Sequence, residues 1–316
     1  MRESLLKNIL VTGTTGFIGS SIRSKLCTLG YQIVSTQRNA NYVNELEFDL
    51  KKPFNLVEQL KNIDVIIHSA AIVHVMDNKI PIDETYQKAN YEATIELAQQ
   101  AVEAGVKRFV FISSIKVNGE TTTGRLPFSS SDLPSPKDAY SLSKAQAEKG
   151  LLDLAAKTGL EVVIIRPPLV YGPGVKANFA NLVKLAMRSF PLPFGAINNK
   201  RSFVFIDNLT DFINIAVYHP AAANHIWLIS DDDDLSTSQL FRLIIQYSKS
   251  KAFLFNIPQD FFVRLCRLLG KKNIAERLCG DLQVDIKHTK EVLGWTPPYT
   301  AQQAIKKTVL SFISKY

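Results

Sequence analysis

Through its first half, the chain alternates short apolar runs with segments in which apolar residues recur every three or four positions. The short runs are rich in β-branched residues and predict buried strands at residues 8–12, 31–36, 45–50, 63–71, 108–114 and 161–167. The periodic segments predict helices at residues 17–29, from about Pro53, at 83–104 and at 137–158. Because strands and helices alternate, the pattern predicts an α/β fold with a doubly wound parallel sheet.

Three glycines spaced three apart follow the first predicted strand, in the stretch "VTGTTGFIGS". They are Gly13, Gly16 and Gly19, and a helix begins among them at Phe17 and Ile18. Glycine lets a phosphate approach the backbone more closely than a Cβ would permit, and a helix N-terminus offers unpaired N–H groups and a positive dipole end. A turn that only packs a helix against a strand can have the same spacing. The order of strand, loop and helix favours a Rossmann-type dinucleotide site.

The regular alternation stops after Gly172. A proline-rich patch at 189–195, a return strand at 202–207 and a helix-rich tail with a last amphipathic helix follow. We expect this part to form a smaller, mostly helical lobe over the carboxyl ends of the strands, where open α/β sheets bind ligands. The predicted division assigns residues 1–172, with a return segment of about 202–230, to the Rossmann domain and residues 173–201 and 231–316 to the lobe.

The composition is that of a compact, enzyme-sized protein. The chain has 316 residues, 46% of them hydrophobic, and its longest apolar stretch, residues 64–76, is too short and too polar to span a bilayer. The N-terminus carries charges where a signal peptide would be apolar. Three cysteines, Cys27, Cys266 and Cys279, lie far apart and suggest neither a disulfide framework nor a zinc site. We expect a cytoplasmic protein with free thiols and no membrane span.

The formal charge of +8 comes from scattered Lys and Arg residues without a long basic stripe. This distribution disfavours nucleic acid and suits an anionic small molecule. The acidic run from Asp231 to Asp234 contains metal-binding residue types, but consecutive side chains point in different directions. With Ser236 and Gln239 behind it, the run fits better before a helix that these two residues cap. We predict no metal site.

Candidate catalytic residues lie near the predicted strand ends. Ser114 ends a buried strand, and a later helix carries Tyr140 and Lys144 in "YSLSK", one turn apart on one helix face. A tyrosine has an unperturbed pKa of about 10, but an adjacent ammonium and a positive nicotinamide ring would both favour the phenolate form of Tyr140. A second Tyr-x-x-x-Lys, from Tyr247 to Lys251, follows no strand-end serine, and we interpret it as surface.

The motifs together resemble the extended short-chain dehydrogenase/reductase family, in its nucleotide-sugar epimerase/dehydratase branch. They are "TGTTGFIG", "FDL", "HSAA", Asn90, "ISS", "YSLSK" and "RPPLVYGPG". The resemblance implies that Ser114, Tyr140 and Lys144 are catalytic. It implies cofactor contacts from Gly13, Gly16, Phe17, Ile18, Gly19, Arg38, Asp49, Leu50, Ala70, Ala71, Asn90, Tyr140, Lys144 and Pro167. It implies substrate contacts from Ser114 and, at the nucleoside diphosphate, from Asn178, Arg201 and Arg277, since guanidinium groups pair well with phosphate.

The second predicted strand departs from the pattern of an NAD site. Such a site normally places Asp or Glu against the ribose hydroxyls, whereas this strand ends in "VSTQRN". With no carboxylate to repel it and Arg38 within reach, a 2′-phosphate is tolerated, so NADP(H) is favoured over NAD(H). Arg38 could equally stack on the adenine of NAD.

Two reactions would use Ser114, Tyr140 and Lys144 alike. The favoured one is reduction of a 4-keto, UDP-linked (deoxy)hexose or N-acetylhexosamine in polysaccharide or O-antigen synthesis, because "SSIKVNGE" and "RPPLVYGPG" resemble that subgroup. The alternative is a 4-epimerase with tightly bound NAD, which oxidises C4 and returns the hydride to the opposite face. A third class is a non-catalytic, nucleotide-sensing Rossmann protein, against which the intact Ser, Tyr and Lys argue.

The position after the strand-end serine separates these reactions from dehydration. Dehydratases of this branch typically carry an Asp-Glu pair there, whereas this chain has Ile115 and Lys116. Isoleucine cannot exchange a proton, and lysine is a cation at neutral pH unless strongly desolvated. We therefore predict no 4,6-dehydratase activity. The resemblance also implies a homodimer through the helices at 83–104 and 137–158.

Overall fold

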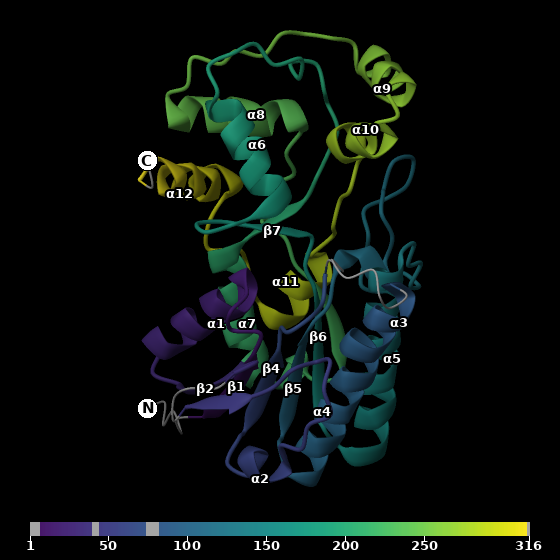
Figure 1. The fold of residues 1–316 in the computed structure, drawn as a ribbon, viewed down its shortest axis with the longest axis vertical. Coiled ribbons are helices and arrows are strands. Elements are labelled where there is room, and N and C mark those ends of the chain that lie inside the picture. Colours follow the sequence, from purple (N-terminus) through teal and green to yellow (C-terminus); the bar gives the residue numbers. More distant parts are fainter. Residues whose placement is uncertain (1–6, 40–43, 74–81, 315–316) are drawn as a thin grey trace.

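A seven-stranded sheet, parallel throughout, organises the molecule (Figure 1). The computed structural model describes residues 7–39, 44–73 and 82–314. In spatial order the strands are β3 (Glu45–Glu47), β2 (Gln32–Gln37), β1 (Asn8–Thr12), β4 (Val65–His68), β5 (Arg108–Ile112), β6 (Glu161–Arg166) and β9 (His225–Leu228). The chain runs outward from β1 in one direction and from β4 in the other, which confirms the doubly wound α/β fold.

Alternate residues of each strand feed two separate cores. In β1, Ile9 and Val11 belong to one buried cluster and Leu10 to the other. The first core is covered by α1 (Phe17–Thr28) and α7 (Ile206–Tyr218), and the second by α2 (Val57–Leu60), α4 (Ala93–Glu103) and α5 (Ala139–Thr158). Both faces of the sheet are therefore buried under helices, which explains why its strands are continuous apolar runs in the sequence.

The lobe continues the first core beyond the sheet. Leu240, Trp295 and Val309 belong to the same buried cluster as Ile9. The helices of the lobe are α6 (Ala177–Met187), α8 (Thr237–Ser248), α9 (Gln259–Leu268), α10 (Lys272–Cys279) and α12 (Ala301–Ile313), while α11 (Lys287–Leu293) lies beside the sheet (Figure 1). The capping box of α8, between Ser236 and Gln239, confirms the predicted helix start.

The acidic run before α8 contributes a buried polar centre. Asp231 accepts hydrogen bonds from Tyr171 Oη at 2.8 Å, from Phe205 N at 2.7 Å and from Asn208 Nδ2 at 2.7 Å. Burial raises the pKa of this carboxyl to about 6 despite those three donors. Asp231 thus joins the return segment to the lobe.

The return strand differs from its prediction. Phe203–Phe205 form β8, which pairs with β7 (Leu169–Tyr171) in a separate two-stranded sheet, and Ile206 already begins α7. The place beside β6 in the main sheet is taken by β9 instead. An apolar run predicts that a segment is a strand but does not predict which strand it pairs with.

Two predicted helices also differ in detail. The helix expected from about Pro53 is the single turn α2. The helix expected at 83–104 consists of α3 (Ile82–Tyr86), a π-helical segment η1 (Gln87–Glu92) and α4. Such π segments are rare and frequent at functional sites, and η1 carries Asn90. In the described part of the chain, none of the helices has the length and apolar character needed to span a membrane.

Candidate active site

The glycine loop lies where the strand order reverses, at the carboxyl ends of β1 and β4. Gly13 has φ +74°, and a Cβ there would lie 2.8 Å from Ala70 N. A Cβ on Gly19 would lie 2.2 Å from Gly13 O, whereas one on Gly16 would meet only Gly13 O, at 3.2 Å. Gly13 and Gly19 are therefore required by the packing of the chain itself. Gly16 is the glycine whose missing Cβ leaves space for a ligand.

The residues at the start of α1 fit a phosphate group. Gly16 is the N-cap residue and provides no side-chain hydrogen bond, and the first turn holds no acidic residue. The first N–H groups of a helix have no partner within the helix. Together with the positive dipole end, they suit the pyrophosphate of a dinucleotide.

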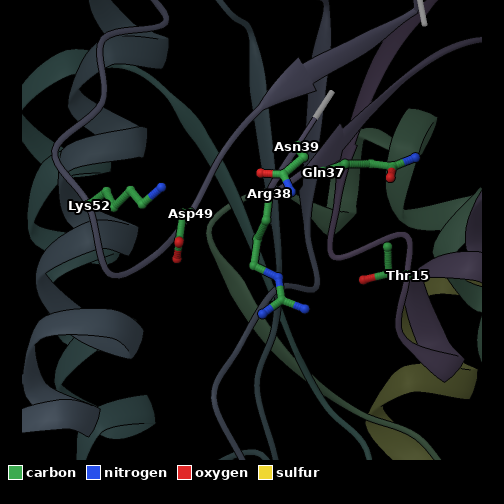
Figure 2. A pocket seen from close by; sticks show the side chains of 6 residues that line it. All are labelled: Thr15, Gln37, Arg38, Asn39, Asp49 and Lys52. Atoms are coloured by element: carbon green, nitrogen blue, oxygen red, sulfur yellow. The ribbon is translucent and has the colours of Figure 1, made fainter. Parts of the chain in front are cut away.

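A pocket of about 490 Å³ continues from this loop towards the end of β2 (Figure 2). It is lined by Thr15, Gln37, Arg38, Asn39, Asp49 and Lys52. Arg38 and Lys52 place two positive charges around the single carboxylate of Asp49. Leu50, the next predicted cofactor contact, is half-buried beside Asp49. The balance of charge in the pocket suits a ligand that carries more than one negative charge.

The loop after β4 is held from both sides. Asn90 Nδ2 donates to Ile72 O at 2.9 Å, and Ile72 N donates to Asn90 Oδ1 at 2.8 Å. On the opposite side, Ala70 N donates to Thr12 Oγ1 at 3.1 Å. The half-buried Ala70 and Ala71, predicted to line the nicotinamide side, lie in the segment that these bonds fix.

His68, the last residue of β4, is buried next to this loop, and no role was predicted for its side chain. Its Nε2 lies 3.0 Å from Thr94 Oγ1, whose own proton goes to Asn90 O, so Nε2 must donate. Its Nδ1, 2.9 Å from Thr12 Oγ1, then accepts. Complete burial lowers the pKa of the imidazole to about 3, so the ring is neutral. His68 thereby fixes the hydroxyl that supports Ala70.

Ser114 lies at the exit of β5 on a well-defined backbone. The ladder to β6 extends past the strand, since Ser113 N donates to Ile165 O at 2.8 Å and Ile115 N to Pro167 O at 3.0 Å. Pro167, a predicted cofactor contact, is thus fixed beside this exit. Ser114 caps the short 3₁₀-helix Ile115–Val117, and its Oγ accepts from Lys116 N at 3.3 Å. Its hydroxyl proton remains free to donate.

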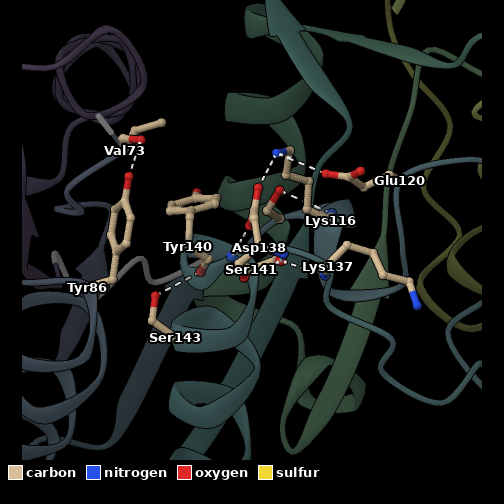
Figure 3. Close-up of polar contacts among 10 residues, drawn as sticks. Val73, Tyr86, Lys116, Glu120, Lys137, Asp138, Tyr140, Ser141 and Ser143 are labelled. Carbon is tan, nitrogen blue, oxygen red and sulfur yellow. Dashed lines mark hydrogen bonds and ion pairs between the residues drawn. The ribbon is translucent and has the colours of Figure 1, made fainter. Parts of the chain in front are cut away.

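Tyr140 lies in the first turn of α5, and an ion pair joins the start of this helix to the segment that follows Ser114. Asp138 caps α5 by accepting from Ser141 N at 2.7 Å, and Lys116 Nζ lies 2.6 Å from Asp138 Oδ2 (Figure 3). This ion pair joins the residue two after Ser114 to the residue two before Tyr140. The Ser141 hydroxyl completes the capping box of α5. The signal in the sequence was an Asp three positions before a Ser.

The ring of Tyr140 packs edge-on against Tyr86 at 6.0 Å, and Tyr86 Oη donates to Val73 O at 2.9 Å. The pKa of Tyr140 is raised, by burial first and then by Asp138 and Tyr86. Lys144 is not among the groups that shift this pKa in the described structure. Lys144 is itself fully buried, and desolvation lowers the pKa of its ammonium to about 7, so its charge is weakened near neutral pH.

A buried ion pair joins α5 to β6 next to the site. Arg166 of β6 donates to Glu148 of α5 through Nε at 3.0 Å and through Nη2, and Nη1 donates to Asn118 Oδ1 at 2.9 Å. Ser113 Oγ also donates to Glu148. Both charged groups are paired and hydrogen-bonded, as burial at 1–3% exposure requires. The network links α5 to both strands that end at the site.

The predicted diphosphate residues lie on the lobe. Arg201 is largely buried and donates to Gly280 O at 3.0 Å. Desolvation lowers the pKa of Arg201, the charge of Asp281 raises it, and the charge of Arg277 lowers it. Asn178 is exposed in the first turn of α6. Arg201 therefore lies within electrostatic range of Arg277, and the carboxylate of Asp281 acts on it more strongly.

The second Tyr-x-x-x-Lys lies away from this site. Tyr247 lies in the last turn of α8, and its Oη accepts from Gln302 of α12 at 2.9 Å. Lys251 is exposed in the following loop.

Comparison with known proteins gives consistent matches over most of the chain. Residues 9–230 match the family described as "NAD dependent epimerase/dehydratase family". A UDP-glucose 4-epimerase of Vibrio cholerae is 46% identical over 97% of this chain and 96% of the relative. An N-acetyl-alpha-D-glucosaminyl-diphospho-ditrans,octacis-undecaprenol 4-epimerase of Escherichia coli O157:H7 is 24% identical over 96% and 94%. The solved structure of a UDP-glucose 4-epimerase from Thermotoga maritima superposes with a TM-score of 0.77 at 23% identity, over 98% of this chain and 99% of that one.

Proposed function

The chain belongs to the NAD-dependent epimerase/dehydratase family, and from that membership we propose that it transfers hydride at C4 of a UDP-linked hexose, as a 4-epimerase. The observation that carries the proposal is the way in which two contacts join the exit of β5 to α5. Lys116 binds Asp138, and Lys144 Nζ donates to Ile112 O at 2.9 Å. The first contact ties the residue two after Ser114 to the residue two before Tyr140, which supports our proposal that both side chains serve one site.

Each side chain has a definite part in this chemistry. The bound nicotinamide would take and return the hydride, and its oxidised ring would supply the positive charge that favours a phenolate. Tyr140 Oη would accept the proton of the C4 hydroxyl and give it back. Ser114 Oγ would donate a hydrogen bond to the same oxygen as it becomes a carbonyl. Lys144 would position the ribose.

Epimerisation is favoured over the 4-keto reduction that the sequence motifs first suggested. The relative at 46% identity carries the name of a UDP-glucose 4-epimerase and spans nearly the whole chain. The reductase and the epimerase use the same three residues, so the side chains alone do not separate them. Ile115 and Lys116 provide no acid and base pair for dehydration, which supports our proposal that the protein is not a dehydratase.

We propose that the substrate binds between the sheet and the lobe formed by residues 173–201 and 231–316. Arg201 and Arg277 would pair with the diphosphate, with Asn178 at the start of α6 as a further polar contact. On the cofactor side, Arg38 at the end of β2 would accept a 2′-phosphate, so we propose that NADP(H) is bound in preference to NAD(H).

The nucleotide content of the purified protein tests the choice between the two reactions. An epimerase regenerates its cofactor in every turnover and retains it, so denaturation should release about one dinucleotide per chain. A reductase exchanges its cofactor in every turnover and should be purified largely without it. Nucleotide-free protein that consumes reduced cofactor in proportion to product would overturn the epimerase assignment.

A further inference from the structure

Helix α9 exposes an apolar stripe at the tip of the lobe. Its inner side is buried through Phe262 and Cys266. Phe261, Leu265 and Leu268, at i, i+4 and i+7, lie along its outer side and are 58%, 41% and 86% exposed. Leu269 continues the stripe at 62%, and Ile274 of α10 is exposed nearby in the chain. Apolar side chains gathered in this way differ from the scattered ones that every surface carries.

The same segment is positively charged. Arg264 and Arg267 of α9, and Lys271 just before α10, are exposed, against one exposed acidic side chain on α9, Asp260. On a helical wheel Arg264 borders the apolar stripe, and Arg267 and Asp260 lie on the polar side beyond it. A helix with Phe and Leu on one side and Arg or Lys on the other is typical of segments that lie in a membrane interface.

The position of the helix makes this surface accessible to a flat partner. Figure 1 shows α9 at the end of the lobe far from the sheet, with α10 next to it on the side towards α3 and α5. The site residues on β5 and α5 are not part of the stripe. A partner can therefore cover α9 without covering Ser114 or Tyr140.

We propose that α9 and the start of α10 dock on the surface of an anionic lipid bilayer. The apolar stripe, named here the α9 stripe (Phe261, Leu265, Leu268, Leu269 and Ile274), would insert at the level of the headgroups, and the basic side chains would pair with lipid phosphates. A second copy of the chain fits less well, because it would place the same three cations opposite one another. The proposal does not depend on the reaction at the active site.

Cosedimentation with vesicles tests the proposal directly. Wild-type protein should bind vesicles of phosphatidylglycerol and phosphatidylethanolamine, bind vesicles of phosphatidylcholine weakly, and lose most binding at high salt. Failure to bind the anionic vesicles at low salt would overturn the proposal, as would a concentration-dependent dimer that is abolished by Leu268→Glu.

Matched substitutions locate the contact. Leu265→Glu and Leu268→Glu should each weaken vesicle binding by about tenfold or more. Each removes a leucine that would be buried in the bilayer and adds a negative charge that the anionic lipids repel. Leu310→Glu on α12, at a leucine 47% exposed, is the control and should bind as wild type does. Arg267→Glu should weaken binding by about fivefold or more, and Lys306→Glu should not. Equal losses in variants and controls would contradict the assignment.

A fluorescent side chain gives an independent measurement. The two natural tryptophans, Trp227 and Trp295, are buried and should respond little to lipid. In Leu268→Trp, anionic vesicles should shift the emission to shorter wavelength, and in Leu310→Trp they should not. An unshifted spectrum in Leu268→Trp would exclude insertion. Turnover of soluble UDP-sugar should stay at the wild-type level in the α9 variants, which separates this test from that of the proposed function.

Discussion

The ammonium of Lys144 donates to the main-chain oxygen of Ile112 at 2.9 Å. The same group lies 4.3 Å from the ring centre of Phe111, so a helix residue is held against the last two residues of β5. Lys144 is fully buried there, and its pKa falls to about 7. The lysine therefore joins α5 to the strand that carries Ser114, and its charge is sensitive to pH near neutrality.

Replacing Lys144 with methionine should change how stability depends on pH. The unfolded lysine titrates near 10.5 and the folded one near 7, so between these values the folded protein holds fewer protons and the wild type gains stability as pH rises. Relative to Lys144→Met, the wild type should gain up to about 1.4 kcal/mol per pH unit across that window. Urea unfolding of both proteins from about pH 6 to about pH 10 measures this difference. A difference independent of pH would contradict the lowered pKa.

Replacing Tyr140 with phenylalanine should abolish most turnover and leave cofactor binding intact. Only the phenolic hydroxyl, which carries the exchangeable proton, is removed, and general acid–base catalysis contributes about 10² to 10⁴ in rate. Tyr247→Phe, in the second Tyr-x-x-x-Lys, is the matched control and should be fully active. Steady-state kinetics and cofactor titration check both variants. Activity of Tyr140→Phe within a few fold of wild type would remove the residue from the mechanism.

Two glycines of the loop, Gly16 and Gly19, should respond differently to substitution. Gly19→Ala should destabilise the fold by about 1–3 kcal/mol, because the new Cβ collides with the main chain of Gly13. Gly16→Val should fold, since its Cβ meets one atom at 3.2 Å, but should bind the dinucleotide much more weakly. Thermal unfolding and cofactor titration separate the two effects. Unchanged cofactor affinity in Gly16→Val would leave the loop with a packing role only.

Arg38 should set the preference between the two cofactors. Arg38→Asp places a carboxylate where a 2′-phosphate would lie, so binding should shift from NADP(H) towards NAD(H). Dissociation constants for both dinucleotides before and after the change measure the shift. The same ratio in both proteins would show that the guanidinium points away from the ribose.

Local sequence patterns predicted the main sheet and its flanking helices well. The β-branched residues of β1 predicted a buried strand, and the glycines after it predicted the loop that leads into α1. Both features can be read from local composition, because a strand buried on both faces is apolar and a tight turn favours glycine. The strand predicted at 202–207 is confirmed in type but covers only Phe203–Phe205, and its pairing with β7 was not predicted. Pairing between β7 and β8 depends on contacts between distant segments, which no local pattern records.

The support around the site was harder to predict for the same reason. Nothing near His68 in the sequence indicates the two threonines that fix its tautomer, one from β1 and one from α4. The spacing of Tyr140 and Lys144 predicted a shared helix face, but not that Lys144 would donate to Ile112 and lose part of its charge by burial. Asp138 had a readable capping signal, whereas its pairing with Lys116 depends on the fold.

The most direct test of the account follows deuterium through the reaction. Purified protein is incubated with UDP-glucose that carries deuterium at C4, without added nucleotide, and the products are analysed by proton NMR and mass spectrometry. The account predicts UDP-galactose that retains the deuterium at C4, because the hydride leaves and returns within one active site. No C4 epimer, a product that forms only with added reduced cofactor, or a product lighter by one water would contradict it.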